Sequence, residues 1–291
     1  MQQMKQKERK NGWINGFIGM LIFSGSLPAT KAAVLGFDPL FLTAARATIA
    51  GLLSLAMLLL YKEKLPTFKQ WISLTVVSLG VVVGFPLLTA IALQEITSAH
   101  SLVFLALLPL STAIFAVIRG GEKPRPIFWL FSIIGSLLVM GYAISQGGAS
   151  SISADLLMIA SVIVCGLGYA EGATLTKALG GWQVICWALI VSLPPMLILS
   201  FILMPEELAT ISVSAWIGLG YVSLFSMLIG FIFWYKGLSQ GGIAAVGQLQ
   251  LLQPFFGLGL AAVLLHESVN LLMLLVTIGV IFCVAGSRKY A

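Results

Sequence analysis

Long apolar stretches alternate with short polar connections along almost the whole chain. Each stretch is long enough for an α-helix to cross a hydrocarbon layer of ~30 Å. The connections are too short to hold a soluble domain, so the pattern predicts an all-α membrane protein with ten transmembrane helices. The expected spans are 13–33, 40–60, 69–91, 98–119, 127–146, 154–176, 183–203, 214–236, 243–265 and 270–287.

A shift of 145 residues aligns the first half of the chain with the second. Residues 70–80 (QWISLTVVSLG) then match residues 215–225 (AWIGLGYVSLF) through the shared pattern W-I-x-L-x-x-V-S-L. A shift of 146 residues matches 30–32 with 176–178, and both read Thr-Lys-Ala. Because these matches combine several special positions, they indicate a duplicated unit.

The repeat predicts a cytoplasmic tail of residues 1–12, a first five-helix unit at 13–147 and a second at 148–291. Because five is odd, the second unit must enter the membrane upside down relative to the first. Inverted repeats are the architecture of many secondary transporters, in which the two halves open a central site alternately to either side. The pattern therefore predicts a transporter that works by alternating access.

Composition supports the membrane class, since 9% of the residues are charged, against about 25% in soluble proteins. Fourteen of the 16 Lys and Arg residues lie in the N-terminal tail, the even-numbered connections and the C-terminal end, and none lies in an odd-numbered connection. Basic residues stay on the cytoplasmic side, so both termini are expected there. The net charge of +6 lies in short clusters beside apolar runs, so the expected partners are a bilayer and a small-molecule substrate, not a nucleic acid. The oligomeric state is left open.

Each repeat ends its fourth helix with a proline followed thirteen residues later by a glutamate, as Pro109 with Glu122 and Pro254 with Glu267. Together with the W-I-x-L pattern, this resembles the EamA domains of the drug/metabolite transporter superfamily, over nearly the whole chain. Within the superfamily the sequence is most similar to the YddG-type exporters of aromatic amino acids. The resemblance implies a cavity between the two halves and export of amino acids and related metabolites across a bacterial inner membrane.

Motifs for other chemistry are missing from the sequence. There is no G-x-x-x-x-G-K-[ST] for direct use of ATP. The two histidines, His100 and His266, form no metal-binding pattern, and no nucleophile–base pair stands at one depth. We therefore expect no catalytic residue, no metal and no cofactor. The open alternatives are an exporter of another metabolite or drug class, an intramembrane enzyme or a channel.

Polar side chains inside apolar spans indicate the solute pathway, because burying them in a bilayer is costly. Glu171 lies about 9 Å from the middle of its span toward the cytoplasm, and Gln248 and Gln250 lie at a similar depth. The rings of Phe85 and Tyr169 could stack on an aromatic substrate. The predicted substrate-binding residues are Ser24, Phe85, Tyr169, Glu171, Gln248 and Gln250.

Other interpretations of these residues stay open. Glu171 and Gln250 could form an interhelical hydrogen-bond clamp without touching substrate, and each aromatic ring could serve packing alone. Arg46 lies about 6 Å to the outer side of the middle of its span. We expect its guanidinium to face the bundle interior, the alternative being that it snorkels to the outer surface.

Small residues, tryptophans and prolines predict local features of the helices. Gly80 with Gly84 and Gly168 with Gly172 are spaced for close helix contact. Tryptophans near span ends are expected to anchor at the membrane surface, and prolines to interrupt helices. The tryptophans are Trp13, Trp71, Trp129, Trp216 and Trp234, and the interruptions fall at Gly25–Pro28, Gly84–Pro86, Pro194–Pro195 and Gln253–Pro254.

Overall fold

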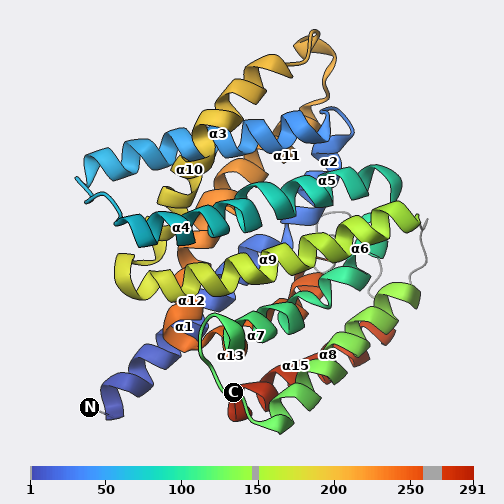
Figure 1. Ribbon diagram of the computed structural model, residues 1–291. Helices are drawn as coiled ribbons and strands as arrows, with labels where there is room; N and C mark the ends of the chain where they lie inside the picture. Colours follow the sequence, from blue (N-terminus) through green and yellow to red (C-terminus); the bar gives the residue numbers. More distant parts are fainter. Residues whose placement is uncertain (1, 146–150, 258–270) are drawn as a thin grey trace.

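The protein is a bundle of helices, and every regular element among the described residues is helical (Figure 1). The computed structural model describes residues 2–145, 151–257 and 271–291. Within these residues nine segments are long and apolar enough to cross a membrane. The expected span 243–265 is described only as far as Gly257, so ten crossings stay a prediction. The nine segments are Gln6–Val34, Pro39–Leu60, Phe68–Glu95, His100–Ile118, Pro126–Ser145, Ile152–Leu179, Gly181–Ile202, Val213–Gly241 and Leu271–Tyr290.

Some crossings are single helices and others are built from shorter pieces. The single helices are α3 (Pro39–Leu60), α8 (Pro126–Ser145), α9 (Ile152–Leu179), α10 (Gly181–Ile202) and α15 (Leu271–Tyr290). The composite crossings are α1 (Gln2–Ser24) with α2 (Ser26–Val34); α4 (Phe68–Val77) with η1 (Ser78–Gly84) and α5 (Phe85–Glu95); α6 (Ser98–Leu105) with α7 (Leu108–Ile118); and α11 (Val213–Tyr221) with η3 (Val222–Ile229) and α12 (Gly230–Gly241). The shorter elements are η2 (Leu208–Thr210), α13 (Ile243–Gly247) and η4 (Gln248–Leu252).

Local sequence sets several helix ends. Asp38 caps α3, because its carboxylate accepts hydrogen bonds from the backbone N–H groups of Leu40 at 2.8 Å and Phe41 at 3.2 Å. Gly180 follows α9 and Gly242 follows α12, with φ of +100° and +95°. Glycine adopts such angles without strain. These tight joints turn the chain directly from α9 into α10 and from α12 into α13.

Helices from the two halves of the sequence pack against one another throughout the bundle. α3 packs along α10, and α8 packs along α15 (Figure 1). α1 packs against α12, while α9 packs against α4, η1 and α5. The outward faces carry exposed apolar side chains such as Leu59, Phe201 and Phe282, which are 68%, 72% and 71% exposed. Such an apolar exterior suits contact with lipid.

Small residues bring α9 close to η1. A Cβ atom on Gly80 would lie 2.6 Å from the carbonyl oxygen of Val164 and 3.1 Å from the Cα of Gly168. A Cβ atom on Gly172 would lie 2.3 Å from the ring of Tyr235. A side chain at these positions would push the helices apart, so the predicted close contact is confirmed for Gly80 with Gly168.

η1 and η3 are π-helical, a feature that the hydrophobic pattern did not indicate. A shift of 145 residues carries Ser78–Gly84 onto 223–229, which lies within η3. A π-helical turn leaves the backbone ladder irregular and re-aims side chains, and such turns are frequent at functional sites. Val81 in η1 and Ser226 in η3 are themselves 145 residues apart, and both line the cavity described below.

Trp234 does not lie at the surface, so its expected role as an interfacial anchor is wrong. The side chain is 0% exposed. Its ring lies 5.9 Å from that of Phe23 and 5.5 Å from that of Tyr169, centroid to centroid. α12 packs along α1, which covers the helix face that carries Trp234. Proximity to a span end therefore did not reveal which way this side chain points.

α10 continues through Pro194 and Pro195 without a break, so the expected interruption there is wrong. Each proline removes one N–H donor and disturbs the preceding turn, which bends a helix but need not end it. The neighbouring Ser192 hydroxyl donates to the carbonyl of Leu189 at 3.0 Å. The break expected at Gly25 is confirmed, since α1 ends at Ser24 and α2 begins at Ser26.

The N-terminal and C-terminal helices meet at the same end of the bundle (Figure 1). The Arg9 guanidinium donates to the backbone carbonyl of Arg288 at 3.2 Å. The Arg288 guanidinium in turn lies 4.6 Å from the centre of a ring of Trp13, a favourable cation–π contact. This end of the bundle is therefore rich in positive charge.

Candidate functional site

A cavity lies inside the bundle, between helices from both halves of the chain. The space inside it that the centre of a water molecule can reach is about 40 Å³. Most of its wall is apolar, with a few polar groups contributed by α2, α3, α5 and η3. The lining residues are Phe23, Ser26, Leu27, Thr30, Arg46, Val81, Phe85, Pro86, Thr89, Leu105, Leu108, Tyr169, Ser226, Phe231 and Gln253. An apolar cavity with a few placed polar groups is the usual form of a small-molecule site.

Arg46 is the one charged side chain among the described residues that line this cavity. It lies on α3, seven residues after Pro39, and is 6% exposed. Its Nη2 lies 3.5 Å from the Ser226 hydroxyl, at the limit of a hydrogen bond, and its buried Nε has no partner among the described residues. The expectation that Arg46 faces the bundle interior is therefore confirmed.

Aromatic rings form one side of the cavity. Tyr169 on α9 lies 5.9 Å from Phe231, centroid to centroid, and Phe231 lies 5.1 Å from Phe23. The interplanar angles of both pairs are 62°, an edge-to-face arrangement that stabilises aromatic clusters. Trp234 packs beneath Tyr169 and Phe23 and supports them. Phe85, at the start of α5, is half-buried and lines the cavity as well.

Gln250 lies one step behind the cavity wall. Its side-chain amide donates to the Tyr169 hydroxyl at 3.2 Å, and it is 4% exposed. Gln253 lines the cavity itself, and its amide donates to the carbonyl of Phe23 at 3.2 Å. The amides of Gln250 and Gln253 therefore hold two of the aromatic residues in place.

Glu171 lies outside the cavity lining, in an ion pair. Its Oε2 accepts a hydrogen bond from Nε of Arg119 at 2.7 Å. Ser73 on α4 is near enough to hydrogen-bond the same carboxylate. Glu171 is 5% exposed, whereas the Arg119 side chain is 47% exposed. The carboxylate thus ties α9 to the C-terminal end of α7 and to α4. Its hydrogen-bond partner is an arginine, whereas the sequence suggested a glutamine amide.

Ser24 and Gln248 also lie outside the cavity lining. The Ser24 hydroxyl donates to the carbonyl of Met20, four residues earlier in α1, at 3.0 Å. Gln248 is 0% exposed, and neither its amide nitrogen nor its oxygen has a partner among the described residues. Of the six predicted residues, the structure brings Phe85, Tyr169 and, one step behind, Gln250 to one place. Substrate contact by all six stays a prediction.

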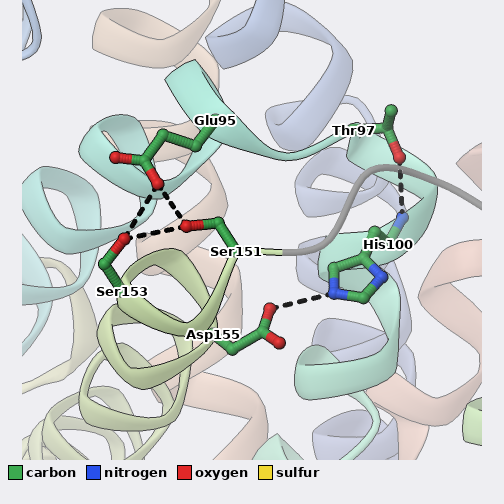
Figure 2. A network of polar contacts seen from close by, with 6 residues as sticks. All are labelled: Glu95, Thr97, His100, Ser151, Ser153 and Asp155. Atoms are coloured by element: carbon green, nitrogen blue, oxygen red, sulfur yellow. Dashed lines mark hydrogen bonds and ion pairs between the residues drawn. The ribbon is translucent and has the colours of Figure 1, made fainter.

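A second polar network joins the two halves at the opposite end from the termini (Figures 1 and 2). His100 on α6 lies 2.9 Å from Asp155 on α9. Glu95, at the end of α5, accepts hydrogen bonds from the hydroxyls of Ser151 and Ser153. Figure 2 shows the two contacts side by side across the start of α9. This network links α5 and α6 of the first half to the start of α9 in the second half.

Glu122 makes the corresponding contact near the termini. Its two carboxylate oxygens accept from the backbone N–H groups of Ile243 at 2.6 Å and Ala244 at 2.8 Å. These N–H groups lie in the first turn of α13, where backbone N–H groups have no acceptor within the helix itself. An ionised carboxylate is a favourable partner at a helix N-terminus. Glu122 therefore ends its own apolar segment, as expected, and also fastens the second half to the first.

Four polar residues of the cavity were not predicted as site residues from the sequence. They are Ser26, Thr30, Thr89 and Ser226, and each carries a hydroxyl inside an apolar span that resembles ordinary helix packing. The Ser26 hydroxyl donates to that of Ser226 at 2.8 Å, across 200 residues of sequence. One signal in the sequence could have identified Ser226 as a site residue. Its repeat counterpart is the apolar Val81, so the hydroxyl occurs in one half only.

The described lining of the cavity carries groups that can bind a solute. Its lining holds hydroxyls, one amide, one guanidinium and aromatic rings, which can hold a solute but do not form a nucleophile–base pair. Within residues 2–145, 151–257 and 271–291, no group of three or more His, Cys, Asp and Glu side chains could hold a metal ion. Reversible binding of a small molecule is what the arrangement supports chemically.

Membrane-spanning helices around an internal cavity define a multi-pass membrane protein. The chain belongs to the EamA-like transporter family, whose model matches twice, at residues 10–143 and 152–288. The two matches also account for the internal repeat.

Similar proteins are described as transporters. A protein of Bacillus subtilis (strain 168), described as the uncharacterized transporter YdeK, is 64% identical over 97% of this chain and 98% of its own. The uncharacterized inner membrane transporter YedA of Escherichia coli (strain K12) is 27% identical over 72% of this chain and 68% of its own. A solved crystal structure is 18% identical, with a TM-score of 0.79 over 97% of this chain and 100% of that one, and it shows the shared fold.

Proposed function

We propose that this protein is a secondary transporter that exports amino acids, with aromatic ones favoured, and related small metabolites across the bacterial inner membrane. The observation that carries the proposal is the cavity, which is lined by four aromatic rings, a guanidinium and several hydroxyls. Rings can stack on an aromatic side chain, while the polar groups can bind the charged end of the solute. The family membership supplies the transporter activity.

Alternating access between two inverted repeats is the mechanism that we propose. Residues related by the repeat line the cavity in pairs: Val81 with Ser226, Pro86 with Phe231 and Leu108 with Gln253 at a shift of 145, and Phe23 with Tyr169 at 146. A cavity built from equivalent positions of both halves lies near the axis that relates them. The same packing adopted by each half in turn would then open the cavity to opposite sides.

Ten crossings and cytoplasmic termini are part of the same proposal. Both termini lie at one end of the bundle, which is consistent with an even number of crossings (Figure 1), and that end carries Arg9, Arg288 and Lys289. Basic residues favour the cytoplasmic side. The connection at 203–212 then lies outside, with the network around His100 and Asp155.

Cysteine labelling of intact cells tests this orientation. A single cysteine introduced at Glu207, which is exposed, should react with a membrane-impermeant maleimide added from outside. A cysteine introduced at the exposed Gln6 should react only after the membrane is made permeable. The three native cysteines are buried and supply the background control. The opposite pattern would reverse the proposed topology.

Transport by purified protein in liposomes tests the function. Radiolabelled amino acids should accumulate in or leave protein-containing vesicles faster than protein-free vesicles, with phenylalanine, tyrosine or tryptophan ahead of aliphatic amino acids. The panel is run with and without a pH gradient, which shows whether flux depends on protons. Movement of another metabolite class with no amino acid moving would overturn the substrate assignment and leave the transporter family unchanged.

A further inference from the structure

We propose that Arg46 binds the carboxylate of the transported solute, so that the substrates are aromatic or apolar carboxylates whose amino group is not required for recognition. The proposal rests on the transporter function given above and names the chemical group that the cavity selects. It predicts that organic acids without an amino group bind, whereas the corresponding amines do not.

The guanidinium of Arg46 is placed to receive an anion. It is nearly enclosed, at 6% exposure, yet no carboxylate of the described residues lies within 4.0 Å of it. Its contact with the Ser226 hydroxyl is long, at 3.5 Å, and its Nε donor is unused. A buried cation without a counter-ion is costly. A solute carboxylate would supply the missing charge and could accept two parallel hydrogen bonds from the planar guanidinium.

Hydroxyl groups beside Arg46 extend the same polar patch. The Ser26 hydroxyl donates to that of Ser226, which faces Arg46. The Thr89 hydroxyl lines the cavity, is buried and has no hydrogen-bond partner among the described residues. Hydroxyls can donate to a carboxylate oxygen as well as accept. Arg46, Ser226 and Thr89 come from α3, η3 and α5, so three helices converge on the patch.

Lys31, the other basic residue inside an expected span, already has hydrogen-bond partners. Lys31 on α2 donates its ammonium protons to the carbonyls of Leu93 at 2.5 Å and Ile96 at 3.3 Å, at the C-terminal end of α5. It does not line the cavity. Lys31 thus stabilises a helix end, while Nε of Arg46 has no partner among the described residues.

The cavity offers no matching site for an ammonium group. None of its described lining residues is Asp or Glu. An amino group could reach only weak partners there, namely hydroxyls, the Gln253 amide and the faces of the aromatic rings. Recognition of an amino acid would therefore come mainly from its carboxylate and its side chain. A free amine without a carboxylate would bring a second positive charge beside Arg46.

Competition in proteoliposomes tests this inference. Phenylpropanoate, which is phenylalanine without its amino group, should compete with labelled phenylalanine for transport. Phenylethylamine, which lacks the carboxylate, should compete at least about 10-fold more weakly, the factor that one charged hydrogen bond contributes. Because this comparison uses the unaltered protein, it does not depend on the folding of any variant.

Direct binding to variants locates the effect. Binding of phenylpropanoate to detergent-purified protein, measured by calorimetry, should weaken about 10- to 100-fold in Arg46→Gln and less in Arg46→Lys, which keeps the charge but loses the fork geometry. Lys31→Gln removes an equal charge outside the cavity and should bind as the unaltered protein does. Ser226→Ala, a smaller change than loss of the charge, should weaken binding several-fold.

The outcomes separate this inference from the proposed function. Transport of phenylalanine with equal competition by the amine and the acid would overturn the role of Arg46 and leave the function standing. Failure of all amino acids to move, with phenylpropanoate bound in an Arg46-dependent way, would overturn the amino-acid assignment and keep the carboxylate site. Phenylpropanoate that binds neither unaltered protein nor variants would refute the site.

Discussion

Replacing Arg119 with alanine should lower the melting temperature of the purified protein by roughly 5–10 °C, a loss of about 2–3 kcal/mol. The Glu171 carboxylate is 5% exposed and receives its charged hydrogen bond from Arg119. Without the cation, this carboxylate is left in a nearly dry site. The Arg119 side chain is 47% exposed, so solvent screening keeps the loss below that of a fully buried pair. Scanning fluorimetry in detergent measures the shift.

A double-mutant comparison separates the ion pair from other effects. Glu171→Gln keeps the shape of the side chain and removes the charge, so it should cost less than Arg119→Ala. The double variant should regain much of the loss, because neither partner then leaves an unpaired charge. Lys123→Ala removes an exposed cation nearby and serves as the matched control. A double variant less stable than both single variants would contradict the pairing.

Transport by the Glu171→Gln variant decides between the two interpretations of Glu171. An ion-pair clamp outside the cavity predicts lower stability with an unchanged order of substrate preference. A residue on the solute pathway predicts a folded protein with altered preference or rate. The contacts of Glu171 favour the clamp, since its carboxylate is bonded to Arg119 and does not line the cavity.

The raised pKa of Arg119 determines how the stability contributed by the Arg119–Glu171 pair depends on pH. The hydrogen bond and the charge of Glu171 raise the pKa of Arg119. A cation with a raised pKa contributes stability that is fully present below its unfolded pKa and is lost only as pH rises through the folded pKa. The difference between the Arg119→Ala variant and the unaltered protein should therefore be the same at about pH 7 and about pH 9.

Glu122→Ala should destabilise the protein by about 3 kcal/mol, because two charge-assisted hydrogen bonds to the start of α13 are lost together. The bonds to Ile243 and Ala244 measure 2.6 and 2.8 Å, and they join α13 to the chain that follows α7. Their N–H groups would be left without partners at a helix N-terminus. The expected fall in melting temperature is roughly 6–12 °C.

Graded variants test the assignment of Glu122. Glu122→Gln keeps one acceptor oxygen and should lose about half as much stability as the alanine variant. Glu206→Ala removes an exposed carboxylate elsewhere and should leave the melting temperature unchanged. Equal melting of Glu122→Ala and Glu206→Ala would show that the contact between the two halves does not stabilise the fold.

The site was predictable only in part, and particular residues show why. Phe85 and Tyr169 were predicted as substrate-binding residues, and Arg46 as an interior-facing charge, because a large ring or a charge inside an apolar span is conspicuous. Ser26, Thr89 and Ser226 were missed because a hydroxyl in a helix usually bonds back to its own carbonyls and needs no further role. They line one cavity only because α2, α5 and η3 meet there.

Helix partners were equally invisible in the sequence. The chain itself showed that Glu122 ends an apolar segment, but the N–H groups it binds lie 121 and 122 residues further on. Trp234 stands near a span end like the other tryptophans, yet it is fully buried and packs against Phe23 of α1 and Tyr169 of α9. The hydrophobic pattern indicates how far along a helix a residue lies. It does not indicate which residues of the neighbouring helix that residue contacts.

The amino-acid sequence by itself determined the membrane class, the helical spans within the described residues and the duplication of the chain, because apolar length and internal similarity are properties of the chain alone. The close approach of η1 and α9 was also readable, since only glycine leaves room for a neighbouring backbone. Tertiary structure alone decided the cavity, the bond between Ser26 and Ser226 and the pairing of Glu171 with Arg119. These features depend on the rotation of each helix about its axis, which is set by how all the helices pack together.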